Sequence, residues 1–216
     1  VAQRLGTTTL AGLVNNAGIA VAGPLLHLPL ADVRRQIEVN VIAQVSVIQA
    51  FAPLLGADRT RKGPPGRIVN MSSVAGRIGA PFMGAYAASK HALEAITDSL
   101  RRELMIYGVD VISIQPGQTA TPIWDKAEAV DYSPYLASDY GNSIRKLLSI
   151  ALKQGRAGYP PEQVAAAVLR ALTIANPPTR IPVVKGKLQN WIIPRLLPDR
   201  MVDRAVAKMM GLQRLG

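Results

Sequence analysis

The sequence predicts an α/β fold, a doubly wound parallel sheet with helices on both of its faces. Short apolar runs, rich in β-branched residues, occur at positions 10–14, 68–71, 109–114 and 181–184 and have the composition of buried strands. Longer stretches with helical periodicity separate these runs, and such alternation is typical of a parallel sheet covered by helices. A chain of 216 residues is long enough for one domain of this kind.

The first predicted strand lies close to the start of the chain, which opens with Val1 rather than methionine. A strand inside a parallel sheet normally has neighbours that preceding βα units deliver. We therefore expect one domain over residues 1–216 that is N-terminally incomplete, with its first βα units missing.

Two long amphipathic helices follow. The first covers about residues 31–55 and the second runs from about Gly84 to Tyr107, each with apolar side chains at spacings of three and four. Asn40 interrupts the apolar pattern of the first helix, and an exposed helix tolerates an asparagine at little cost. Tyr86 and Lys90 are four residues apart, so they share one face of the second helix.

The predicted strand at 68–71 ends at Ser72 and Ser73, where open parallel sheets bind their ligands. A lysine ammonium about 4 Å from a tyrosine would lower the pKa of the phenol by roughly three units before solvent screening. Such a phenol can act as general acid and base near neutral pH. The alternative is that Tyr86 and Lys90 are two unrelated residues on a half-exposed helix, because their spacing also arises by chance.

The region after the strand at 109–114 is less regular. Residues 118–140 are rich in Pro, Tyr, Asp and Ser, and we expect residues 118–160 to form a substrate loop or lid. Helices are expected at 142–154, at 161–175 and from about Asp199 onward. Residues 186–216 form a basic, apolar C-terminal extension that includes Leu188 and Trp191.

Composition excludes several classes of site. The chain has no cysteine, and its two histidines, His27 and His91, are far apart, so neither disulfides nor a metal site is expected. No uninterrupted run of about 18 apolar residues and no signal peptide is visible, so we expect no membrane span. A cytoplasmic location fits this composition.

Nearly all of the net positive charge lies in the C-terminal third. Residues 141–216 hold 13 Lys and Arg against 3 Asp and Glu, whereas residues 1–140 hold 12 against 11. No recognition motif or set of stacking aromatics accompanies these charges, so no nucleic-acid partner is expected. The basic surface is either simply solvated or faces an anionic partner.

Five motifs together resemble the short-chain dehydrogenase/reductase family along essentially the whole chain. They are NNAG at 15–18, Asn40 in EVNV, Ser73 in IVNMSS, YAASK at 86–90 and PGQTAT at 116–121, in the family's order and spacing. The resemblance implies a Rossmann-like fold. It also implies an NAD(P)-dependent oxidoreductase that interconverts an alcohol and a ketone or aldehyde.

The resemblance assigns roles to individual residues. Tyr86 would exchange a proton with the substrate oxygen, and Ser73 would donate a hydrogen bond to the same oxygen. Lys90 would lower the pKa of Tyr86 and bind the nicotinamide ribose, and Asn40 would hold a water in the proton path. Ser73, rather than Ser72, lies 13 positions before Tyr86, which is the family's usual spacing.

The same resemblance predicts which residues contact NAD or NADP. Besides Tyr86 and Lys90 they are Asn16, Ala17, Gly18, Pro116, Gly117, Thr119 and Thr121. Thr119 stands where the family usually has an aliphatic residue.

One motif of the family is missing from the chain. The glycine-rich TGxxxGxG turn, which binds the cofactor pyrophosphate at a helix N-terminus, would lie about 75 to 80 residues before NNAG by family spacing. We therefore expect the 216-residue chain alone to bind dinucleotide very weakly. The alternative function is that of a truncated or noncatalytic relative, serving as a binding or oligomerisation module.

The C-terminal sequence is similar to the branch of the family that acts on lipophilic alcohols, such as retinol and steroids. Trp191, Ile192, Ile193, Leu196 and Leu197 could wall an apolar substrate pocket, lie on a membrane surface beside Arg195 and Arg200, or cover a sheet edge or subunit contact. The resemblance also implies a homodimer or homotetramer, formed through the two long helices.

Overall fold

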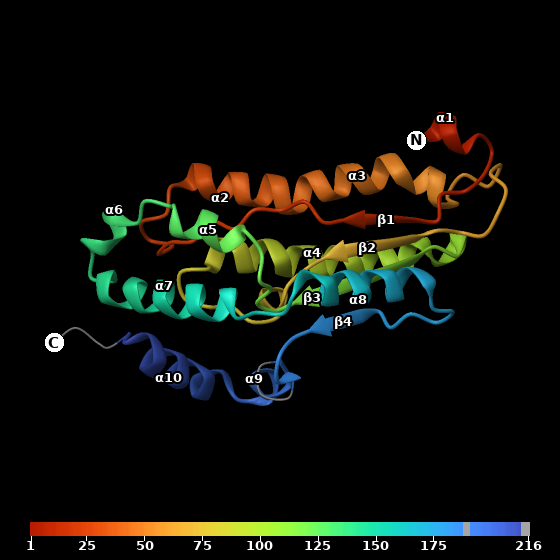
Figure 1. Ribbon diagram of the computed structural model, residues 1–216. Coiled ribbons are helices and arrows are strands. Elements are labelled where there is room, and N and C mark those ends of the chain that lie inside the picture. Colours follow the sequence, from red (N-terminus) through yellow and green to blue (C-terminus); the bar gives the residue numbers. More distant parts are fainter. Residues whose placement is uncertain (188–190, 213–216) are drawn as a thin grey trace.

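The computed structural model describes residues 1–187 and 191–212, except for the side chain of Arg195. Leu188 and residues 213–216 of the C-terminal extension lie outside the described residues. In the described part of the chain one sheet of parallel strands has the order β1-β2-β3-β4 (Figure 1). The strands are β1 (Gly12–Asn15), β2 (Arg67–Met71), β3 (Asp110–Pro116) and β4 (Arg180–Val183). The predicted parallel sheet is thus confirmed.

The two long predicted helices lie side by side on one face of the sheet. The first is continuous but composite, and the second ends in a 3₁₀ turn. The segments are α2 (Leu30–Ile37), the π-helical turn η1 (Glu38–Ile42), α3 (Ala43–Phe51), η2 (Ala52–Leu55), α4 (Gly84–Glu103) and η4 (Leu104–Tyr107). They bury an apolar layer against β2 and β3 that consists of Ile48, Leu55, Ile68, Leu104, Val109 and Val111.

Helix α8 (Pro161–Thr173) covers the opposite face. Ala171 packs there against Val69, Met71, Ile112 and Ile114, the residues that alternate with those of the first layer. The doubly wound arrangement is therefore confirmed. Helix α4 connects β2 to β3 and α8 lies in the connection from β3 to β4, so both connections move across the sheet in the same direction. Because the two helices lie on opposite faces of the sheet, these two crossover connections have opposite hands.

The composite helix Leu30–Leu55 is long and apolar enough to cross a membrane by length and composition, with 26 residues and a mean hydropathy of 1.4 in its most apolar window. The sequence contains no uninterrupted apolar run at this helix, because Asn, Gln and Ser side chains break it. For that reason the helix was not recognised as a candidate membrane span from the sequence. In the structure this helix packs on the sheet, where Ile48 and Leu55 are buried.

Residues 118–140 are more regular than expected. They contain α5 (Ile123–Glu128) and α6 (Ser133–Leu136), and α7 (Gly141–Arg156) follows. Both short helices lack a periodic apolar pattern, which is why the sequence did not reveal them. Residues 118–160 form an excursion from the sheet whose two ends lie side by side. Thr119 pairs with Tyr159, and the Ala120 amide donates a hydrogen bond to the Tyr159 carbonyl at 2.8 Å.

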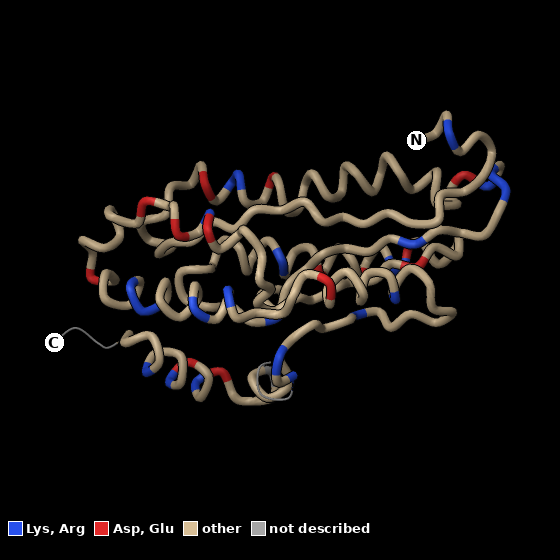
Figure 2. The backbone as a smooth tube through the Cα atoms, in the orientation of Figure 1, with Lys and Arg blue, Asp and Glu red and all other residues tan. Residues whose placement is uncertain are grey.

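The chain ends are helical. A short helix α1 (Ala2–Leu5), which the sequence did not predict, precedes β1, and α9 (Ile193–Leu196) and α10 (Asp199–Met210) follow β4. Helix α10 lies beside α7, and Figure 2 shows Lys and Arg residues along both. The C-terminal basicity seen in the sequence is thus collected on one side of the molecule.

Candidate active site

The carboxyl ends of β1, β2 and β3 bring the sequence-predicted residues together. The Ser73 hydroxyl lies 3.5 Å from the Pro116 carbonyl, and Lys90 Nζ donates a hydrogen bond to the Met71 carbonyl at 2.8 Å. A Cβ placed on Gly18 would lie 3.3 Å from Asn40 Oδ1 and 3.8 Å from Lys90 Nζ. Three strand ends and both long helices therefore meet at one place.

Ser73 and Tyr86 face one another. Ser73 caps the short turn η3 (Val74–Gly76), because its Oγ accepts a hydrogen bond from the Ala75 amide at 3.1 Å. Burial raises the pKa of the Tyr86 phenol above its ordinary 10, and a hydrogen bond with Ser73 opposes that shift. At neutral pH Tyr86 is consequently protonated, and its side chain faces that of Ser73.

Ser72 points elsewhere. Its side chain is buried and faces the Glu94 carboxylate, whose pKa it helps to lower, although its geometry falls short of a hydrogen bond. Of the two serines at the end of β2, Ser73 is thus the one beside Tyr86.

The Lys90 ammonium lies near Tyr86. Its Nζ lies 5.8 Å from the centre of the Tyr86 ring, because the side chain extends toward the end of β2 and bonds the Met71 carbonyl. Burial lowers the pKa of Lys90 to about 8, and the nearby Glu94 carboxylate opposes this shift. Burial is the largest influence on the pKa of both groups, and the lowering of the pKa of Tyr86 by Lys90 stays a prediction.

Asn40 is buried, so the interpretation as a tolerated residue on an exposed helix was wrong. Its side chain accepts a hydrogen bond from the Ile19 amide at 2.8 Å and donates to the Ile19 carbonyl at 2.9 Å and to Ser89 Oγ at 3.1 Å. Ser89 in turn donates to the Tyr86 carbonyl at 2.7 Å. The π turn that contains Asn40 is a feature often found at functional sites.

Two glutamines repeat this arrangement one turn before and after Asn40. Gln36 accepts from the Val21 amide at 2.7 Å and donates to the Ile19 carbonyl at 2.9 Å, and Gln44 donates to the Ala17 carbonyl at 2.6 Å. The three amide side chains hold the chain that leaves β1. The sequence reasoning missed both glutamines, although amides at intervals of four on an apolar helix were a signal that could have found them.

The expected cofactor contacts fall into two groups. Asn16, Ala17 and Gly18 are exposed at the end of β1 and border Lys90. Thr119 and Thr121 lie instead at the neck of the 118–160 excursion, where their carbonyls accept hydrogen bonds from the Trp124 indole and amide. Pro116 and Gly117 come between the two groups. At Gly117 a Cβ would lie 3.0 Å from Val184 Cγ1, so a larger residue there would crowd the chain just after β4.

The residues present fit the nicotinamide end of a dinucleotide. Among the described residues the Lys90 ammonium has one hydrogen-bond partner, the Met71 carbonyl, and an ammonium carries three protons. Two protons remain to bind hydroxyl groups, and the small, exposed residues 16–18 permit a ligand to approach the backbone closely.

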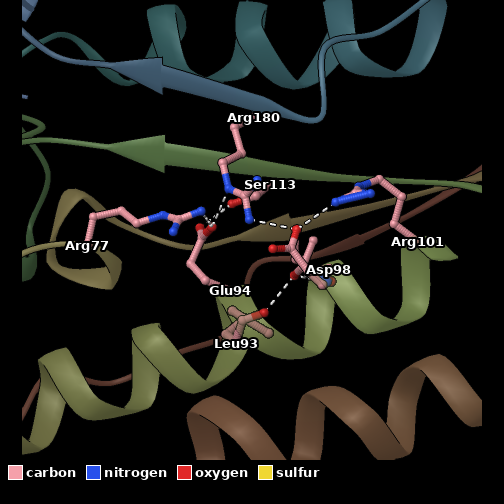
Figure 3. A network of polar contacts seen from close by, with 9 residues as sticks. Arg77, Leu93, Glu94, Asp98, Arg101, Ser113 and Arg180 are labelled. Atoms are coloured by element: carbon pink, nitrogen blue, oxygen red, sulfur yellow. Dashed lines mark hydrogen bonds and ion pairs between the residues drawn. The ribbon is translucent and has the colours of Figure 1, made fainter. Parts of the chain in front are cut away.

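An ionic network around the buried Glu94, which the sequence did not reveal, lies one turn beyond Lys90 (Figure 3). The Glu94 carboxylate accepts hydrogen bonds from Ser113 Oγ at 2.5 Å and Arg180 Nε at 2.9 Å, and Arg77 lies 3.4 Å away. Arg180 also bonds Asp98 at 2.6 Å. Charged residues of this kind normally lie on the surface, so their sequence positions gave no hint of burial.

Comparison with known proteins agrees with this geometry. The family model described as short chain dehydrogenase matches residues 1–131. An NADPH-dependent 3-dehydrocapnine reductase of Ornithobacterium rhinotracheale is 42% identical over 204 residues, which cover 94% of this chain and 71% of that protein. Retinol dehydrogenase 5 of Mus musculus is 37% identical over 216 residues, covering 94% of this chain and 65% of that protein.

The solved structures agree on the fold. A short chain dehydrogenase/reductase from Burkholderia phymatum in complex with NAD has a TM-score of 0.70 and 24% sequence identity, covering 91% of this chain and 68% of that one. The chain thus spans about two thirds of the length of these proteins. Since the family model covers more than half of the sequence, the chain belongs to the short-chain dehydrogenase/reductase family of oxidoreductases, whose cofactor is NAD or NADP.

Proposed function

We propose that the protein interconverts an alcohol and a ketone or aldehyde with NAD or NADP, using Ser73, Tyr86, Lys90 and Asn40. The observation that carries the proposal is that the Ser73 and Tyr86 side chains face one another at the end of β2, with the Lys90 ammonium nearby. Two adjacent O–H groups can both reach one carbonyl oxygen. In the family to which the chain belongs the nicotinamide, when bound, supplies or accepts the hydride.

The protonation state of Tyr86 favours its role as an acid. Because burial raises the pKa of Tyr86, the phenol carries its proton at neutral pH and can donate it to the carbonyl oxygen during reduction. Ser73 donates to the same oxygen and polarises the C–O bond. For alcohol oxidation the same two groups act in reverse, once Tyr86 has lost its proton.

Lys90 and Asn40 support this pair. The Lys90 ammonium places a positive charge beside the phenol, and its two remaining protons are available to ribose hydroxyls. Asn40 fixes the chain at Ile19 and, through Ser89, the start of α4. That Asn40 also holds a water in the proton path stays a prediction.

An apolar substrate is supported by a cavity of about 380 Å³ between the turn at 79–81, which follows Ser73 and η3, and helix α10. Its walls include Pro81, Val202, Val206 and Leu212. These apolar side chains suit the hydrocarbon part of an alcohol or ketone, and Asp203 adds one charged group to the wall.

We also propose that residues 118–160 act as a substrate lid. Tyr140, at the start of α7, packs edge-to-face on Phe82 with ring centres 5.6 Å apart, so the excursion contacts the turn that leads into α4. Phe82 itself has a φ of 65°, an unfavourable conformation for a residue with a side chain. Strain of this kind is often kept at functional sites.

Two surfaces are candidates for contacts with partners. Helix α10 exposes a basic stripe, Arg200, Arg204 and Lys208, next to the exposed Met201 and Met209, which suits peripheral contact with an anionic membrane. The two long helices expose five large apolar residues, which supports a homodimer or homotetramer. They are Leu30, Ile42, Val47, Met105 and Ile106.

Replacing Tyr86 with phenylalanine tests the catalytic role. In the full-length protein Tyr86→Phe is expected to lower kcat/KM for ketone reduction by a factor of about 100 or more, because the proton donor is lost while the ring remains. The measurement is NAD(P)H oxidation with a panel of ketones. Tyr107→Phe, in η4 at the far end of the same helical stretch, is the matched control and should leave the rate unchanged. Unchanged turnover in Tyr86→Phe would refute the assigned role.

Lys90 should make the stability of the fold depend on pH. The pKa of Lys90 is about 8 when folded and about 10.5 when unfolded, so the protonated side chain destabilises the fold at neutral pH. That penalty disappears as pH rises from 8 toward 10.5, and we expect the unfolding free energy to gain about 2 kcal/mol from this group between pH 7 and 9.5. Denaturant unfolding of the parent and of Lys90→Met across this pH range measures the unfolding free energy. An equal pH dependence of that free energy in both proteins would contradict a buried Lys90 ammonium.

Flotation with anionic lipid vesicles tests the α10 surface. The parent protein should float at low salt and be released as salt rises, and Met201→Ser/Met209→Ser should float less. Met105→Ser, at another exposed methionine in η4, serves as control. Flotation that does not depend on salt, or that the double substitution leaves unchanged, would exclude this surface.

Light scattering of the full-length protein without vesicles should give the mass of a dimer or tetramer. A monomer mass would contradict the proposed oligomer.

A further inference from the structure

We propose that Glu94 is a positioning residue of this active site: its buried carboxylate keeps Lys90 in the cationic form and fixes the Ser73 turn against α4. The inference rests on the proposed function, because it assigns Glu94 a part in the same proton-transfer site. Nothing in the five family motifs points to this residue.

Glu94 continues the line of active-site residues on α4. Tyr86, Lys90 and Glu94 are four residues apart in succession and share one face of the helix. Glu94 is 3% exposed and Lys90 is 6% exposed, so both residues are shielded from solvent. Screening is weak at such a site, and the carboxylate favours the protonated lysine. Accordingly, Glu94 raises the pKa of Lys90 against the larger effect of burial.

The carboxylate can play this part because other elements keep it ionised. Burial alone would raise the pKa of the Glu94 carboxyl. Hydrogen bonds from Ser113 on β3 and Arg180 on β4, together with the nearby Gln115 and Ser72 side chains, outweigh the effect of burial. The pKa of Glu94 therefore lies below its usual value. Figure 3 shows Arg77, Ser113 and Arg180 converging on the carboxylate. The charged groups that face it are Arg77, Arg180 and Lys90.

Glu94 also ties the Ser73 turn to the helix. At Gly76, the last residue of η3, a Cβ would lie 3.0 Å from Glu94 Cγ and 3.1 Å from the Lys90 carbonyl oxygen. The turn that Ser73 caps therefore lies directly on α4 between Lys90 and Glu94. The ion pair between Arg77 and Glu94 holds the residue that follows this turn.

Asp98 provides a control within the same network. It is one turn farther along α4, bonds Arg180 at 2.6 Å and Arg101 at 2.9 Å, and its side chain is 26% exposed. Loss of the Asp98 charge weakens the same ionic network, but Asp98 is one helical turn farther from Lys90 than Glu94 is. Its loss should therefore change the charge of Lys90 less. A purely structural network would respond similarly to Glu94→Gln and Asp98→Asn.

The charge of Lys90 can be measured without any reaction. In full-length protein labelled with ¹³C at the lysine ε carbons, the Lys90 signal, assigned with Lys90→Arg, is followed by NMR as pH is raised. Glu94→Gln should move the titration down by about one pH unit, a tenfold change in the ionisation constant. Arg180→Met should move it up, because a cation is removed, and Asp98→Asn should move it by less than half as much as Glu94→Gln.

The pH profile of ketone reduction is the second readout. The alkaline limb of kcat/KM should shift in the same directions as the Lys90 titration, so that Glu94→Gln is about tenfold slower than the parent on that limb. Glu94→Asp, which keeps the charge, should restore most of the loss.

The outcomes separate the two proposals. A Lys90 titration that does not move in Glu94→Gln, or that moves the same way in Glu94→Gln and Arg180→Met, overturns the role of Glu94. If Glu94→Gln does not fold, a downward or absent shift in Arg180→Met overturns it instead. Absence of ketone reduction in the parent, with the titration shifts as expected, refutes the proposed function and leaves the electrostatic link between Glu94 and Lys90 standing.

Discussion

The polar side chains buried between α4 and the sheet constrain the rest of the structure, because each costs free energy unless it has a partner. Asn70 on β2 accepts a hydrogen bond from Asn15 on β1 at 3.0 Å and donates to Thr97 on α4 at 2.9 Å. Ser113 and Lys90 add bonds to Glu94 and to the Met71 carbonyl. These contacts allow one rotation and one axial position of α4 over β1, β2 and β3. Tyr86 is thereby delivered to the end of β2.

The chemistry of the site follows from that placement. The same burial that fixes α4 raises the pKa of Tyr86 and lowers the pKa of Lys90, so it favours the uncharged form of both groups. A neutral phenol beside a serine hydroxyl is suited to donating a proton to a carbonyl. Glu94 then opposes the loss of charge from Lys90, and the arginines around Glu94 keep the carboxylate ionised.

The sequence predicted the strands and long helices well because their apolar periodicity reflects burial on one or two faces. The resemblance to the family singled out Ser73, Tyr86, Lys90 and Asn40, which the structure places near one another, and their roles stay predictions. Periodicity could not show that Asn40 is buried in a π turn, since an asparagine there looks like a solvent-exposed residue. Nor could it show that Lys90 bonds the Met71 carbonyl, or that Glu94 meets Arg180 from 86 positions away, because such contacts depend on how distant strands align.

The most direct test of the central claim is a crystal structure of the full-length protein with a bound nicotinamide dinucleotide. We expect the hydroxyls of the nicotinamide ribose to lie within hydrogen-bond distance of Lys90 Nζ and Tyr86 Oη. Gly18 should lie alongside the ribose, and the Ser73 hydroxyl should face the nicotinamide ring. A dinucleotide bound elsewhere, with Lys90 still bonded only to the Met71 carbonyl, would contradict it.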